Sequence, residues 1–348
     1  MTTDVNRREF LKATVAAGTV LMAGDLIAAP DGRREAARIP ELDSIVVTVI
    51  TDNYYDALRP DAPVTKRYRV LPGTSMHAEH GLSYFIETVS AGRATGFMFD
   101  YGLDGGGVNR NMALLGIDLG KAAGFGLSHG HFDHWSGLKD VLELNRSKIR
   151  KGTPLFVGPE VFERRYSLVP GTTNRMDIGK LNRAELESLD VVRVSEVTSP
   201  TEVLPGGYLT GPIARVTDYE KPNPTLLVEK EGAAVVDSFP GEQAMVFNLK
   251  GKGLVVLSSC AHSGIVNTIR QAQSMTGVEK VHAVIGGFHL INAKPEVIQR
   301  TVADIKAIQP AIIVPAHCTG FEAITLFARE MPGQFILNTA GTRYTFSA

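Results

Sequence analysis

The chain has 348 residues, of which 44% are hydrophobic and 21% are charged, and this composition excludes fibrous, low-complexity and disordered classes. Its 36 basic and 37 acidic residues give a net charge of -1, so nothing favours nucleic acid and we expect a small-molecule substrate. Two cysteines cannot form a disulfide framework, and the stability must therefore come from packing.

The first thirty residues have the order of an export signal. The run NRREFLK at 6–12 holds an arginine pair and precedes an apolar run of small residues at 13–21. This order predicts a twin-arginine signal, and an ordinary amphipathic helix is the alternative. Because glycines and an aspartate interrupt the apolar stretch, we expect no permanent membrane span. We predict a signal peptide and joint at 1–37, recognised by the twin-arginine export machinery, which places the chain in the periplasm or otherwise outside the cytoplasm.

Strands and helices alternate along the mature chain, 38–348, which we interpret as a single domain. Short β-branched and apolar runs predict strands at 44–50, 83–89, 95–100, 124–128, 225–229, 233–237, 253–258, 282–285 and 311–314. Helical spacing of apolar residues appears at 265–275 and 296–308, and a further helix is expected to begin near Ser136. This alternation favours α/β layers.

The segment at about 151–222 has a different amino-acid composition. It carries charges, prolines and glycines without a long strand pattern. We predict a loop-rich insertion, with short helices, over one edge of the core. Loops of this kind are a common place for substrate contacts.

The strongest local motif is LSHGHFDHWSGL at 127–138, between a predicted strand and a predicted helix. Residues two apart in extended backbone point to the same side, so His129 and His131 can place two imidazoles on one ion. Asp133 and His134 follow at the turn and can face a second ion. Nitrogen and oxygen ligands of this kind suit zinc, iron or manganese. A solvated polar loop is the alternative.

Three later histidines each follow a predicted strand after a few small residues: His262 in SSCAHSG, His289 in GGFHL and His317 in PAHCTG. Four ligands from one loop do not complete two metal shells, so we expect these histidines to converge on the 127–138 loop. Taken singly, each is equally well explained as a hydrogen-bonded loop histidine. Together they indicate a metal site.

These motifs resemble the metallo-β-lactamase superfamily, through the H-x-H-x-D-H run at 129–134 and the later histidines. The resemblance covers nearly the whole mature chain and implies a four-layer αββα sandwich. The closer similarity is to the branch named for 7,8-dihydropterin-6-ylmethyl-4-(β-D-ribofuranosyl)aminobenzene 5'-phosphate synthase. It rests on EHGLS at 79–83, CAHSGIVN at 260–267, GGFHL at 286–290 and HCTG at 317–320.

The resemblance implies one or two divalent metal ions per chain, with zinc expected before iron or manganese. One ion would be held by His129, His131 and His262. The other would be held by Asp133, His134 and His317.

Five further residues have roles that the resemblance or their position suggests. His289 stands where the superfamily commonly has a bridging aspartate, so it binds one ion or faces the substrate. Asp100, in FMFDYG, is expected to buttress the metal loop. His80 is either a proton relay and substrate contact or a turn histidine. Cys260 and Cys318 adjoin predicted ligands, and we expect them to be buried without binding metal, with direct ligation or a disulfide as alternatives.

Adjacent divalent ions lower the pKa of bound water and supply hydroxide as a nucleophile. We therefore predict an exported metal-dependent hydrolase of a small ester, lactone or phosphoester, in which Asp133 also orients the metal-bound hydroxide. A synthase-like transferase is the second hypothesis. A non-catalytic metal-bearing binding or sensor protein is the third, and the sequence predicts no oligomeric state.

Overall fold

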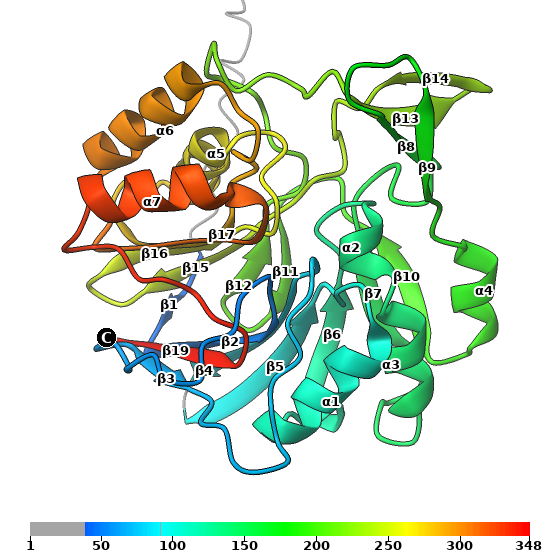
Figure 1. Ribbon diagram of the computed structural model, residues 1–348. Coiled ribbons are helices and arrows are strands. Elements are labelled where there is room, and N and C mark those ends of the chain that lie inside the picture. The colour runs from blue at the N-terminus through cyan, green and yellow to red at the C-terminus, as the bar shows by residue number, and fades with distance from the viewer. Residues whose placement is uncertain (1–38, 91) are drawn as a thin grey trace, which may run out of the picture. The chain divides into compact units, whose positions relative to one another are not determined.

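The computed structural model describes residues 39–90 and 92–348 (Figure 1). The predicted signal peptide and joint at 1–37 lie outside the described residues, and the domain boundary there stays a prediction. Within the described part, every helix is too short or too polar to cross a membrane.

One main sheet has eight strands in the order β10-β7-β6-β5-β4-β2-β19-β3. Its strands are β2 (Ser44–Thr51), β3 (Thr65–Arg67), β4 (Ser83–Ser90), β5 (Arg93–Phe99), β6 (Ala122–Gly126), β7 (Thr153–Val157), β10 (Val192–Glu196) and β19 (Thr342–Ser347). Pairing is parallel from β5 through β6 and β7 to β10. The carboxyl ends of β5 and β6 therefore meet at one edge, where Asp100 and the histidine-rich loop begin.

The other main sheet has seven strands, six of them in the order β11-β12-β15-β16-β17-β18, and β1 (Glu41–Leu42) pairs with β15. The six are β11 (Thr201–Leu204), β12 (Gly207–Leu209), β15 (Met245–Leu249), β16 (Gly253–Leu257), β17 (Val281–Gly287) and β18 (Ile312–Ala316). Strands β16, β17 and β18 are parallel neighbours. The three loops that carry the later histidines consequently start at the same edge.

Apolar side chains of the two sheets face each other and form a buried core that includes Val47, Phe97, Phe247 and Ile285. On the outer face of the eight-stranded sheet pack α1 (Gly105–Leu115), α3 (Leu138–Leu144) and α4 (Arg183–Ser188). The seven-stranded sheet is covered by α5 (Ile265–Thr276), α6 (Pro295–Ile308) and α7 (Phe321–Glu330) (Figure 1). The predicted four-layer αββα sandwich is confirmed.

The segment at 151–222 differs from our prediction. It supplies β7 and β10 to one main sheet and β11 and β12 to the other. Its strands β8 (Arg165–Leu168) and β9 (Arg175–Gly179) join β13 (Leu226–Lys230) and β14 (Ala233–Val236) in a separate four-stranded sheet. The predicted short helix is present as α4. The prediction missed the strands because they have only three to five residues, too few to show a clear alternation of apolar and polar side chains.

Candidate metal centre

The loop after β6 places its histidines through a sharp change of direction. His129 follows the end of the strand, and His131 is the N-cap residue of the short helix α2 (Phe132–Trp135). The His131 side chain makes no capping hydrogen bond, so its ring nitrogens stay available. Asp133 and His134 lie on α2 and are buried.

Asp100, which follows β5, holds this loop in place through hydrogen bonds. Its carboxylate accepts hydrogen bonds from Ser128 N at 2.8 Å and Ser128 Oγ at 2.7 Å. Its Oδ2 also lies 2.7 Å from His134 Nδ1. With the proton on Nδ1, His134 presents the lone pair of Nε2 to the pocket. Asp100 thus has the contacts expected of a residue that orients a metal ligand.

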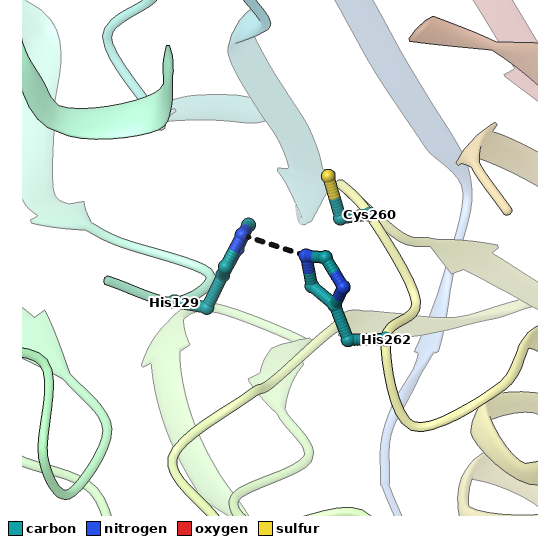
Figure 2. A group of neighbouring side chains, drawn as sticks. All are labelled: His129, Cys260 and His262. Atoms are coloured by element: carbon teal, nitrogen blue, oxygen red, sulfur yellow. Dashed lines mark hydrogen bonds between the residues drawn. The ribbon is translucent and has the colours of Figure 1, made fainter. Parts of the chain in front are cut away.

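His129, His131 and His262 form the first cluster, as predicted. Their ring centroids are 4.6 to 4.8 Å apart, and His129 Nε2 lies 3.1 Å from His262 Nε2 (Figure 2). Burial holds the pKa of all three imidazoles well below the usual value. Neutral imidazoles are the form that binds metal.

Asp133 is the centre of the second cluster. Its Oδ2 lies 3.2 Å from His317 Nε2, 3.5 Å from His134 Nε2 and 3.6 Å from His80 Nε2. Burial lowers the pKa of His317, but the Asp133 carboxylate and Cys318 outweigh it and raise that pKa to about 9. Burial likewise lowers the pKa of His134, and the Asp133 and Asp100 carboxylates raise it above the usual value. The structure therefore gathers all three ligands that we predicted for the second ion.

Several imidazole nitrogens in this site are buried without a hydrogen-bond partner: His262 Nδ1, His289 Nδ1 and His317 Nδ1. Buried polar atoms are nearly always paired, so this concentration points to a ligand for the nitrogens. Two nitrogens bound at about 2.0 Å to one tetrahedral zinc ion would lie ~3.3 Å apart, close to the His129–His262 separation. The side chains present thus fit a divalent metal ion.

Cys260 is buried beside the predicted ligands, at a position that favours the alternative of direct ligation. Its Sγ lies 3.1 Å from His134 Nε2 and belongs to two groups of potential ligands, one with His129 and His262 and one with His134 and His317. Figure 2 shows Cys260 and His262 on one loop, with His129 facing His262 from another. The position of Cys260 two residues before His262 was the only sequence signal for this placement.

His289 lies apart from the second cluster. It stands just after β17, and its ring centroid is 4.0 Å from that of His262. Its potential ligand atoms group with the sulfurs of Cys260 and Cys318. The structure thus places His289 beside His262 of the first cluster and beside the two cysteines.

The loop that holds His262 is fastened by residues that sequence reasoning missed. The Glu242 carboxylate accepts hydrogen bonds from His262 N and Ser263 N, each at 2.6 Å. The Phe239 ring stacks on the His262 imidazole with centroids 3.9 Å apart. Non-glycine residues with positive φ gather here: Asp100, Phe239, Ala261, His289 and His317. Strained backbone of this kind concentrates at functional sites.

No family model matches the chain. The crystal structure of a metal-dependent hydrolase of the β-lactamase superfamily aligns with a TM-score of 0.68 and 25% identity, covering 87% of this chain and 100% of that one. Over 263 residues the chain is 33% identical to the 7,8-dihydropterin-6-methyl-4-(β-D-ribofuranosyl)-aminobenzene-5'-phosphate synthase of Methanocaldococcus jannaschii, covering 74% of this chain and 87% of the synthase. The chain belongs to the synthase branch of the metallo-β-lactamase superfamily.

This chain is also 28% identical to an uncharacterised protein of the same archaeon. The match extends over 253 residues and covers 71% of this chain and 87% of that protein. The predicted resemblance is confirmed. The chain is therefore an enzyme of a fold whose members bind divalent metal.

The prediction that the chain is a hydrolase is overturned by this relationship, because the relative with 33% identity is a synthase. The error came from treating the hydroxide chemistry of paired metal ions as the default for the fold. One fold supports many reactions, so the more similar relative outweighs that general expectation.

Proposed function

We propose that the chain catalyses a transfer reaction of the synthase type, which joins a dihydropterin through its 6-methyl carbon to a ribofuranosylaminobenzene 5'-phosphate. The supporting observation is the 33% identity spread over 87% of the synthase. Similarity of that extent is not confined to one shared segment. A divalent ion held by the clusters described above would supply Lewis-acid chemistry to such a reaction.

The joining requires a leaving group on the methylene carbon, such as a diphosphate ester. The amine nitrogen of the aminobenzene attacks the methylene carbon, so that a carbon–nitrogen bond forms as the carbon–oxygen bond to the departing diphosphate breaks, and the nitrogen loses a proton. A bound divalent ion supplies Lewis-acid stabilisation of the departing phosphate oxygen. We propose one or two ions, zinc before iron or manganese, held by His129, His131 and His262 and by Asp133, His134 and His317.

His80 is the side chain that we propose to accept the proton. Among the predicted site histidines only His80 is exposed, with 56% of its side chain accessible. Its ring stacks on that of His317 with centroids 4.9 Å apart, and its Nε2 faces the Asp133 carboxylate. It therefore stands at the solvent-exposed side of the second cluster, where an incoming substrate can reach it.

The reaction is tested by incubating the metal-loaded chain with 6-hydroxymethyl-dihydropterin diphosphate and ribofuranosylaminobenzene 5'-phosphate. Mass spectrometry should detect the joined product and free diphosphate with the wild-type chain. A His129→Ala, His131→Ala double variant should yield neither. Release of 6-hydroxymethyl-dihydropterin without joined product would contradict the proposal.

We also propose that residues 1–37 direct export through the twin-arginine pathway to the periplasm. The support is the sequence alone, with Arg7 and Arg8 preceding an apolar run. A reporter fused after residue 40 should be translocated. An Arg7→Lys, Arg8→Lys version should remain in the cytoplasm, and equal retention of both reporters would contradict export.

A further inference from the structure

We propose that Cys260, Cys318 and His289 form a third metal-binding position, which takes a soft, thiol-seeking ion beside the two clusters already described. The two sulfurs lie 3.2 Å apart. A ring nitrogen of His289 and both sulfurs all lie within 4.8 Å of one another. Cys318 and His289 belong to neither set of ligands assigned to the other two ions.

The fold brings these three residues together by a simple rule. Strands β16, β17 and β18 are adjacent and parallel, and Cys260, His289 and Cys318 each follow the end of one of them. The neighbouring backbone also approaches closely at this edge. A Cβ atom on Gly287 would lie 2.1 Å from the Ser259 carbonyl oxygen and 2.8 Å from Cys318 Sγ, so a larger residue there would crowd both the backbone and the thiol.

Burial and unmet hydrogen bonding also indicate a ligand. The two cysteines are 3% and 4% exposed, and both are free thiols. His289 Nδ1 is buried without a partner, and the residue is held at a φ of 46°. A buried nitrogen without a partner is costly, and an ion held by the two neighbouring sulfurs is a group that a ring nitrogen of His289 could also bind.

The spacing of the sulfurs fits a shared ion better than a covalent bond. Two thiolates on one tetrahedral zinc ion, each at about 2.3 Å, would lie ~3.7 Å apart. A disulfide would bring them to about 2.0 Å. The separation of 3.2 Å is nearer the first value. Binding would release both thiol protons to solvent and leave two thiolates to neutralise the ion.

Cobalt titration of the reduced, metal-free chain tests this position without measuring catalysis. The wild-type chain should develop near-ultraviolet absorption from sulfur-to-cobalt charge transfer. Cys318→Ser should lose this absorption and bind one ion fewer per chain, whereas the His129→Ala, His131→Ala variant should keep it. Absence of this absorption in the wild-type chain would overturn the proposal. Persistence of the absorption in Cys318→Ser would also overturn it, because the bound sulfur would then be that of Cys260 within the histidine clusters.

A matched pair of histidine variants controls for general damage to the fold. His289→Ala should bind one ion fewer, whereas His282→Ala should bind as the wild type does. His282 lies on the same strand β17, and its ring packs against Phe346 with centroids 5.8 Å apart. Equal metal binding by the two variants would overturn the proposed third metal-binding position. Absence of free thiols in the denatured, untreated chain would also overturn it. Neither result bears on the proposed reaction.

Discussion

Asp100 connects the strand β5 to the metal loop through one carboxylate. Because its oxygens accept two bonds from Ser128 and face His134 Nδ1, they can be replaced only by an equally strong acceptor. In an asparagine, the side-chain N–H₂ would replace one carboxylate oxygen. It would face a donor of Ser128 or His134, with which it cannot form a hydrogen bond. We predict that Asp100→Asn weakens metal binding about 10–100-fold, as loss of an orienting partner usually does.

Metal titration by calorimetry measures this affinity. Asp118→Asn is the control, because Asp118 accepts a hydrogen bond from Gly120 N in an exposed turn. That variant should bind metal as the wild type does. Unchanged affinity in Asp100→Asn would show that Asp100 does not orient a ligand.

His80 should separate catalysis from metal binding. His80→Gln is expected to lower kcat ~10²-fold or more, as loss of a general acid–base group does, with little change in metal content. His77→Gln is the nearby control, since the His77 ring hydrogen-bonds Glu79 at 3.2 Å. Steady-state kinetics with elemental analysis measures both quantities. Loss of metal together with kcat would instead make His80 a ligand.

Among single residues, the sequence predicted those that directly follow strands. His262 and His317 lie near each other because the parallel strands β16 and β18 end at one edge of the same sheet, and that rule can be applied without a structure. The position of Cys260 could not be predicted in this way. Whether its sulfur faces the space between two histidine clusters depends on the path of the loop, and Ala261 in that loop has positive φ.

At the scale of elements, helix α5 begins without a side-chain cap of its own, after Gly264. Glu220, distant in sequence, accepts hydrogen bonds from Val266 N and Asn267 N at 2.9 Å each. A Cβ on Gly264 would lie 2.2 Å from this carboxylate, which explains the glycine. The contact positions the start of α5, next to His262.

We predict that Glu220→Gln destabilises the chain by about 1–3 kcal/mol, because the glutamine amide would face a backbone N–H and leave it without an acceptor. Urea unfolding measures the change. Glu187→Gln, which alters an exposed pair with Arg183, should cost less than about 1 kcal/mol. Equal stability of the two variants would refute the capping role.

Elements with continuous apolar runs, such as β2 and β16, were predicted close to their observed bounds. Helix α1 was not, because its sequence opens with three glycines, which disfavour helix. Tertiary packing overrides that preference. A Cβ on Gly105 would lie 2.5 Å from Asp140, and one on Gly107 would lie 2.2 Å from His77, so close contacts require the glycines.

For the molecule as a whole, the site depends on the packing of one sheet against the other. The loop at 127–134 follows the eight-stranded sheet, and His262, His289 and His317 follow the seven-stranded sheet. The buried core between the sheets therefore sets the distances among the ligands. The fold class could be predicted from alternation and motif resemblance, whereas the reaction could not, because the fold alone does not determine it.

We propose that histidines from separate loops bind divalent metal at one site. Elemental analysis of the purified chain measures this most directly, in the wild type and in the His129→Ala, His131→Ala double variant. We predict at least one ion per wild-type chain and a clear loss in the variant. Less than one ion per chain, unchanged in the variant, would contradict the account.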